Sequence, residues 1–177
     1  MMPANYFTSL WLALCGFDAK DVNQAIAIIR EARDNDKTIY IFGNGGSAST
    51  AEHFAGDLVK MAGVRAFALT TLPLVTAYAN DEGYDASFLG VLGKVMRSGD
   101  VAVGISCSGQ SKNVLHALDL APLVGKTIML TSEGSPTKGN WNCVIRVPGD
   151  DIRIQEDIHL AVCHAIAGAL GELYPWI

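Results

Sequence analysis

Short apolar runs alternate with longer amphipathic segments along most of the chain. The runs are rich in β-branched residues and are predicted as buried strands at 38–42, 65–69, 101–105, 127–130 and 143–147. Segments with apolar residues at helical spacing are predicted as helices at 18–36, 49–60, 84–97, 112–123 and 152–173, with a helical turn at 74–80. Because apolar strands separated by helices form parallel sheets covered on both faces, the pattern predicts a three-layer αβα sandwich.

The first predicted helix, at 5–17, differs from the others because apolar residues cover most of its circumference. They are Phe7, Leu10, Leu12, Leu14 and Phe17. Such a helix is typical of a segment that packs against something beyond its own domain. No repeat, linker or low-complexity tract is visible, so we predict one domain over 1–177, with residues 1–19 forming a helix used in assembly.

Composition narrows the class of protein. Half of the residues are hydrophobic and 18% are charged, which is typical of a compact globular protein. The net charge of −5 argues against a duplex nucleic-acid binder, but it does not exclude small anions, which backbone N–H groups can hold. The four cysteines are scattered without a C-x-x-C pair, and neither a secretory leader nor an apolar run of membrane-spanning length is present. We therefore expect a cytoplasmic protein with reduced thiols that does not bind membranes.

Two loops rich in Gly and Ser, 43–47 and 106–111, each lie between a predicted strand and a predicted helix. Ligands of open parallel sheets bind beyond the carboxyl ends of the strands, where glycines, hydroxyls and helix N-termini suit a phosphate. A nicotinamide cofactor is disfavoured because the strand at 65–69 is not followed by the acidic residue that holds a ribose, and no Gly-Lys-Ser/Thr indicates a P-loop. For either loop alone an ordinary strand-to-helix turn remains an alternative, which the presence of two such loops weakens.

Histidines and carboxylates near these loops form the second candidate feature. His53 and Asp57 lie four residues apart on the helix that the first loop opens, so they share a face. Such a pair can ligate a metal or act as a base and its orienting partner, although a surface polar pair is the commoner interpretation. Its place next to a predicted anion site favours function. His164 lies on the final helix, where we interpret His159 and Cys163 as packing residues.

Four segments, in this order, resemble the SIS (sugar isomerase) domain family. They are GNGGSAS at 43–49 with HFAGDL at 53–58, Ala-Asn-Asp at 79–81, GISCSGQS at 104–111 and IHLAVCHAI at 158–166. Within that family the segments resemble the phosphoheptose (sedoheptulose 7-phosphate) isomerases, and the resemblance covers roughly residues 20–173. It implies a five-stranded parallel sheet of the flavodoxin-like type and a homotetramer with sites between subunits. The N-terminal helix would then take part in assembly.

The resemblance also implies roles for individual residues. Sugar contacts fall on the first loop, at Asn44, Gly45, Gly46 and Ser47. The phosphate falls on Ser106, Cys107, Ser108 and Ser111, with Asn80 and Asp81 beside the substrate. His53 falls on a metal ligand, Asp57 on a catalytic and metal-binding glutamate, and His164 on the catalytic histidine, which is a zinc ligand in metal-bearing members.

This sequence departs from the family pattern at three places. Asp57 replaces a glutamate, Cys107 replaces a threonine, and the family's glutamine on the final helix has no unambiguous counterpart. Gln155 is nine residues before His164, about 900° of helical rotation, and so points to the opposite face. Glu156, eight residues before His164, is within about 80° and has the family's spacing, so we predict that it faces the cleft as a substrate and metal residue. The alternative is that Glu156 only favours the positive end of its helix.

The function implied is an aldose–ketose isomerase that converts sedoheptulose 7-phosphate, or a similar sugar phosphate, through a cis-enediolate. A Zn²⁺ held by His53, Asp57, Glu156 and His164 would polarise the carbonyl group. The alternative is a non-catalytic SIS module that senses a sugar phosphate or binds a protein partner, as the replication-initiator-binding members do. The presence of both His53 and His164 favours the enzyme, because a pure binding scaffold has no need of both.

Overall fold

The structure is a computed structural model that describes residues 3–171. Within these residues, five strands form one sheet: β1 (Thr38–Gly43), β2 (Arg65–Ala68), β3 (Val101–Ile105), β4 (Lys126–Ser132) and β5 (Cys143–Val147). The α-helices are α1 (Pro3–Gly16), α2 (Lys20–Asp34), α3 (Gly46–Ala62), α4 (Leu72–Asp81), α5 (Ser87–Val95), α6 (Lys112–Leu120) and α7 (Ile152–Leu170). Two short 3-10 helices, η1 (Tyr84–Ala86) and η2 (Ala121–Leu123), precede α5 and follow α6.

The sheet has the strand order β2-β1-β3-β4-β5, and every pair is parallel. This order is the flavodoxin-like one, in which the chain reverses direction across the sheet between β1 and β3. The register sets Gly43, the last residue of β1, beside Ile105, the last residue of β3. The two polar loops therefore begin next to each other at the carboxyl edge of the sheet. The predicted fold class is confirmed.

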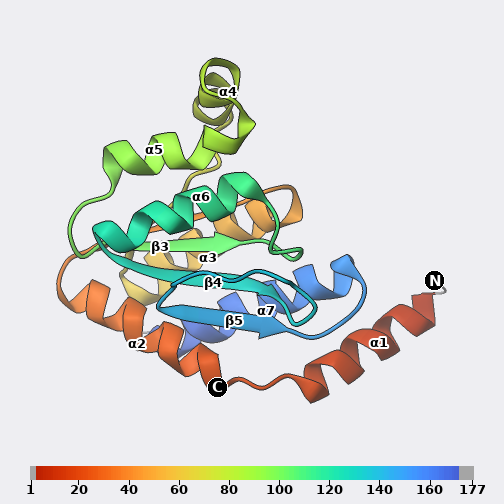
Figure 1. Cartoon of the computed structure of the whole chain (residues 1–177). Helices are drawn as coiled ribbons and strands as arrows, with labels where there is room; N and C mark the ends of the chain where they lie inside the picture. The colour runs from red at the N-terminus through yellow and green to blue at the C-terminus, as the bar shows by residue number, and fades with distance from the viewer. Residues whose placement is uncertain (1–2, 172–177) are drawn as a thin grey trace.

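Helices cover both faces of the sheet, as Figure 1 shows. On one face, α2, α3 and α7 pack against alternate residues of the strands, among them Ile41, Val103 and Leu130. On the other face, α5 and α6 pack against the intervening residues, among them Phe42 and Met129. Strands that bury both faces are stabilised by this apolar contact, which accounts for their continuous hydrophobic sequence.

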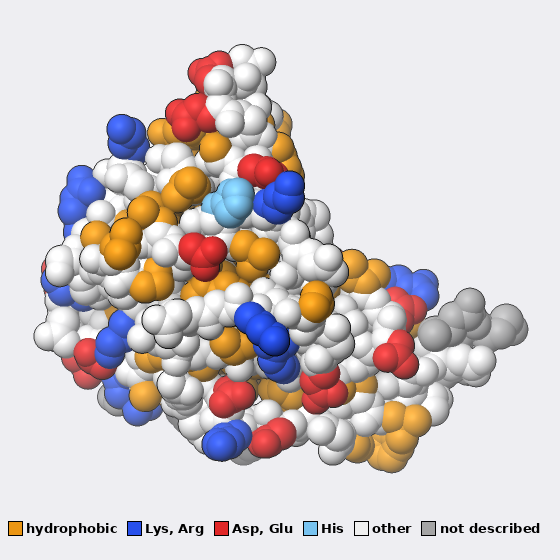
Figure 2. Space-filling model, viewed as in Figure 1, with side chains coloured by type: hydrophobic (Ala, Val, Ile, Leu, Met, Phe, Trp, Pro, Cys, Tyr) orange, Lys and Arg blue, Asp and Glu red, His pale blue; other side chains and the backbone are white. Residues whose placement is uncertain are grey.

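Two helices extend from this body. Helix α4 projects at the top of Figure 1, and along α4, which is described in full, no residue is buried. Helix α1 extends at the lower right and contacts α7. Phe7 and Trp11 of α1 are 68% and 63% exposed, and hydrophobic side chains gather along its underside in Figure 2. Acidic and basic side chains are interspersed over the rest of this view (Figure 2), which shows no broad basic patch on that face of the described residues.

The predicted element boundaries need three corrections. Helix α3 begins at Gly46 rather than 49, because Gly45 adopts φ +55 and turns the chain at once. The predicted turn at 74–80 is a full helix from Leu72, started by Pro73 in its first turn. The predicted helix at 84–97 begins as the 3-10 helix η1 and ends at Val95. Residues 172–173 of the predicted final helix lie outside the described residues.

None of the helices in the described part of the chain combines the length and the apolar character needed to cross a membrane.

Candidate functional site

The first loop and the start of α3 are held tightly against the neighbouring strand. A Cβ on Gly43 would lie 2.7 Å from Ser47 Cβ and 2.8 Å from the carbonyl oxygen of Ile105, so only glycine fits there. Ser47 is consequently buried in the first turn of α3, whereas Gly45 and Gly46 are exposed. The exposed glycines bring bare backbone to the surface at a helix N-terminus, an arrangement that suits an oxygen-rich ligand.

The second loop, residues 106–111, forms a compact turn at the end of β3. The Ser106 and Ser111 hydroxyls are hydrogen-bonded at 3.0 Å, and Gln110 N–H donates to Ser108 Oγ at 3.2 Å. Gly109 has φ +60, which favours glycine. Ser108 is exposed and lines a cavity of about 680 Å³ together with Cys107. Among the three serines of this loop, Ser108 is exposed, Ser111 is half-buried and Ser106 is buried. The exposed hydroxyl before the N-terminus of α6 is a donor that suits a phosphate.

The far wall of this cavity is the segment 133–136, which Arg146 holds in place. The Arg146 guanidinium donates to the carbonyl oxygens of Ser132, Ser135 and Thr137 at 3.4, 3.3 and 3.0 Å. A Cβ on Gly109 would lie 1.9 Å from Ser135 Oγ, so this segment packs directly on the second loop. Nothing in the sequence pattern singles out Arg146, because its partners are backbone carbonyls that no motif records.

The histidines and the carboxylate predicted from the sequence do come together. Asp57 Oδ2 lies 3.0 Å from His164 Nδ1 and 3.5 Å from His53 Nε2, so one oxygen contacts both rings. The ring centroids of the two histidines are 4.9 Å apart. All three side chains line a cavity of about 600 Å³ between α3 and α7. The i, i+4 spacing on α3 produces two of the three residues of this cluster, and the packing of α7 on α3 supplies His164.

This cluster fits a divalent metal. His53, Asp57 and His164 each offer one ligand atom, and these atoms lie within 4.8 Å of one another. Two imidazoles and one carboxylate are a donor set that zinc accepts, with a fourth position left for water or substrate. Because a tetrahedral zinc places its ligand atoms about 3.3 Å apart, only small side-chain movements are needed. The structure therefore offers a possible His/Asp/His metal site.

Glu156, the fourth predicted ligand, lies elsewhere. Its carboxylate lies beside the exposed Gly46, where a Cβ would come within 2.5 Å of Glu156 Oε1. Glu156 shares a cavity of about 280 Å³ with His53 but is not part of the group of three ligand residues. Gln155 points to the second loop instead, since its Nε2 donates to the carbonyl oxygen of Gly149 at 2.6 Å and it lines the cavity of Ser108. The two neighbours on α7 thus face different loops.

The thiol of Cys107 is buried and contacts a histidine of the protein core. Cys107 Sγ lies 3.6 Å from His159 Nδ1, and His159 Nε2 lies 3.3 Å from the carbonyl oxygen of Thr131. Burial lowers the pKa of His159 to about 4, so the ring is neutral: Nε2–H donates to Thr131 and Nδ1 accepts from the thiol. Burial, with the nearby charge of Glu156, raises the pKa of Cys107 to about 11. The thiol keeps its proton and is no nucleophile. His159 and Cys163 are both fully buried, as expected of packing residues.

Asn80 and Asp81 stand apart from the other predicted residues in this chain. Both are exposed at the end of α4, and Asn80 Nδ2 donates to Asp81 Oδ1 at 2.7 Å. Neither residue lines the cavities of the histidine cluster or of the second loop. Within one chain, the geometry does not bring this pair to the predicted ligand.

Asn44 makes contacts that sequence reasoning did not anticipate. Its side chain exchanges hydrogen bonds with Asn113 of α6 and accepts one from the Tyr84 hydroxyl at 2.8 Å. Asn113 was missed because a buried asparagine in a helix looks like an ordinary polar position. The only available signal was its place two residues after Ser111, in the first turn of the helix.

Comparison with known proteins agrees with this geometry. The model of the SIS domain family matches residues 4–132. The chain belongs to the SIS domain family. It is 35% identical over 157 residues to a phosphoheptose isomerase of Helicobacter pylori, covering 84% of this chain and 82% of that protein. It is 39% identical over 154 residues to one of Geotalea uraniireducens, covering 82% of this chain and 81% of that protein.

Solved structures show the same relationship. The phosphoheptose isomerase of Neisseria gonorrhoeae superposes with a TM-score of 0.87 at 30% identity, covering 94% of this chain and 95% of that one. The phosphoheptose isomerase of Francisella tularensis gives the same TM-score at 24% identity, which shows the fold alone. This SIS protein is therefore homologous to phosphoheptose isomerases over most of its length.

Proposed function

We propose that this protein is an aldose–ketose isomerase that converts sedoheptulose 7-phosphate into a heptose 7-phosphate. The observation that carries the proposal is the cluster of His53, Asp57 and His164, in which His53 shares a cavity with Gly46 of the first loop. Binding a sugar phosphate needs loops alone, whereas moving a proton between C1 and C2 needs a base close to the sugar. Homology to phosphoheptose isomerases supports this choice of reaction and sugar.

The residues of this chain divide the chemistry as follows. Ser108, which lines the cavity of the second loop, holds the phosphate together with Ser106 and Ser111, and the C1–C2 end of the sugar extends toward Glu156 and the histidine cluster. Asp57 removes the C1 proton of the ketose and returns it to C2, through a cis-enediolate. His164 moves the hydroxyl proton from O1 to O2, and its Nδ1–H bond to Asp57 orients the ring. A divalent metal on His53, Asp57 and His164, joined by Glu156, would supply positive charge to the enediolate.

A direct assay tests the reaction. Purified protein is incubated with sedoheptulose 7-phosphate in D₂O, with and without added zinc, and deuterium at C1 and C2 is followed by NMR. We expect exchange that requires both the protein and the sugar. Binding without any exchange would overturn the enzyme and favour a non-catalytic module that senses the sugar phosphate or binds a protein partner.

The phosphate site has its own test. Replacing Ser108 and Ser111 together with alanine is expected to weaken sugar-phosphate binding by about 1–3 kcal/mol, the scale of lost hydrogen bonds to a charged group. Ser98→Ala is the control, because Ser98 is exposed and precedes β3 at the opposite edge of the sheet. Titration calorimetry measures both, and equal affinities for the double variant and the control would remove the proposal.

We further propose a homotetramer with sites between subunits. Two features support it: the exposed Phe7 and Trp11 on α1, whose burial stabilises an assembly, and the separation of Asn80 and Asp81 from the other predicted residues. A second copy of the chain can bring α4 to the site. Sedimentation velocity at micromolar concentration is expected to show a tetramer, which Trp11→Glu shifts toward smaller species. A fully active monomer would contradict the assembly.

A further inference from the structure

Two asparagines from different loops face each other and exchange a pair of hydrogen bonds. Asn44 Nδ2 donates to Asn113 Oδ1 at 2.9 Å, and Asn113 Nδ2 donates to Asn44 Oδ1 at 2.9 Å. Asn44 follows β1 in the first loop, whereas Asn113 lies in the first turn of α6, directly after the second loop. Asn113 is only 2% exposed. The pair therefore forms a direct side-chain link between the two loops.

The surroundings fix the orientation of both amides. Asn113 Oδ1 also accepts from Val114 N–H at 3.0 Å, and Asn113 Nδ2 also donates to Ser87 Oγ at 3.2 Å. A carboxamide offers two lone pairs and two N–H donors, so Asn113 is fully used. Because a backbone N–H can only donate, the Val114 bond determines which end of Asn113 is the oxygen.

The side chain of Asn44 has almost all of its hydrogen-bonding groups paired. Its oxygen accepts from Asn113 and from the Tyr84 hydroxyl, and one of its two amide hydrogens goes to Asn113. A single N–H of Asn44 remains outside this network. Asn113 thus determines how Asn44 presents its last donor, although Asn113 does not line the cavity at Ser108.

We propose that Asn113 is a positioning residue. It holds Asn44 and so sets the spacing between the first loop, which contacts the sugar, and the second loop, which binds the phosphate. This inference rests on the proposed function, in which one ligand spans both loops. A sugar phosphate makes contacts in both loops at once, so its affinity depends on their separation. Inorganic phosphate reaches only the second loop and is insensitive to that separation. The difference between these two ligands distinguishes positioning from a general contribution to folding.

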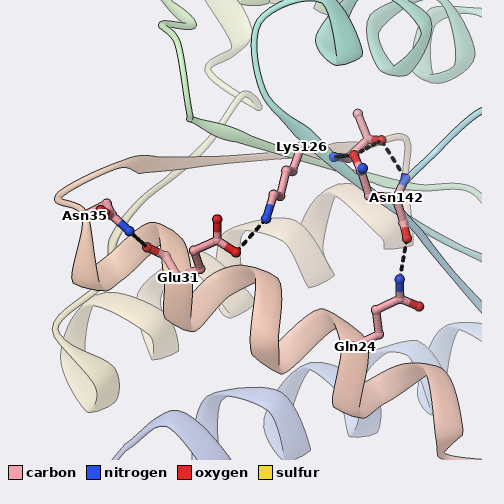
Figure 3. A network of polar contacts seen from close by, with 6 residues as sticks. Gln24, Glu31, Asn35, Lys126 and Asn142 are labelled. Atoms are coloured by element: carbon pink, nitrogen blue, oxygen red, sulfur yellow. Dashed lines mark hydrogen bonds and ion pairs between the residues drawn. The ribbon is translucent and has the colours of Figure 1, made fainter.

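The test is Asn113→Asp, which keeps the size of the side chain and its bond to Val114 N–H. It replaces the donor to Asn44 Oδ1 with an oxygen and so breaks the reciprocal pair. The matched control is Asn142→Asp, in a network between α2 and β4 that Figure 3 shows. There Asn142 Oδ1 only accepts, from Thr127 N–H at 2.8 Å and from Thr127 Oγ1 at 3.2 Å, so an aspartate preserves the contacts.

Calorimetry with sedoheptulose 7-phosphate and with inorganic phosphate gives the main readout. For Asn113→Asp we expect sugar-phosphate affinity to fall about tenfold, the scale of one buried hydrogen bond, with phosphate affinity changed less than about threefold. Asn44→Ala should show the same pattern, and the double variant should be no weaker than either single one. An equal loss for both ligands, additive effects, or a loss of the same size in Asn142→Asp would overturn the proposal.

Hydrogen exchange in the ligand-free protein separates this proposal from the proposed function. If wild-type protein binds no sugar phosphate, the proposed function fails, but the loop link can still be judged. In Asn113→Asp we expect faster amide exchange at 44–48, far away in sequence, with β4 unchanged. Unchanged exchange at 44–48 would overturn the link. If Asn113→Asp does not fold, Asn44→Ala, at a half-buried position, supplies the same measurements.

Discussion

Replacing Asp57 with asparagine is expected to reduce turnover by about 10²–10⁴-fold, the usual contribution of a well-placed base. Asp57 Oδ2 is the one atom that both His53 and His164 approach, at 3.5 and 3.0 Å. Asparagine keeps the shape but removes the negative charge, so the variant can neither take the substrate proton nor serve as an anionic ligand. Metal content should fall with turnover, because a neutral amide is a weak partner for zinc.

The measurement combines initial rates on sedoheptulose 7-phosphate with metal analysis of dialysed protein. Asp34→Asn is the matched control, since Asp34 is exposed at the end of α2 and pairs only with the adjacent Arg33 among the described residues. Unfolding midpoints of both variants should stay near that of the wild type, because Asp57 is at the surface of a cavity. Wild-type turnover in Asp57→Asn would show that this carboxylate is not the base.

The sequence was most informative where local chemistry decides the structure. Strands such as 101–105 are apolar on both faces and were predicted within a residue or two, and the loops after them follow from the rule for open sheets. His53 and Asp57 were paired by helical periodicity alone. These features depend on the spacing of residues within one segment, so a sequence displays them directly.

The features that were missed depend on packing between segments. Asn113 and Arg146 act through contacts with residues 69 and 9–14 positions away, and their partners are amides and backbone carbonyls. No periodicity records such contacts. Helix α4 was underestimated for a related reason: its exposed apolar residues, including Leu72 and Leu74, do not form the single stripe that predicts a helix.

The last prediction compares two neighbours on α7. Glu156→Ala is expected to weaken metal binding by about 10–100-fold and to lower turnover, whereas Gln155→Ala should keep the metal. Glu156 shares a cavity with His53 and lies over Gly46, so we expect its carboxylate to turn toward the cluster when a metal is bound. Gln155 donates to Gly149 on the other side, and its loss should mainly weaken binding of the phosphate end.

If Glu156 only stabilises a helix end, its replacement will affect folding and not metal binding. Its carboxylate sits at the N-terminal end of α3, where a negative charge stabilises a helix by about 0.3–1 kcal/mol. If that is its only role, Glu156→Ala will lower the free energy of unfolding by this amount and leave metal content and turnover unchanged. Glu156→Gln separates the two effects further, because it keeps the volume over Gly46 and removes only the charge. Metal loss in Gln155→Ala with metal retained in Glu156→Ala would mean that the helical register assigned to α7 is wrong.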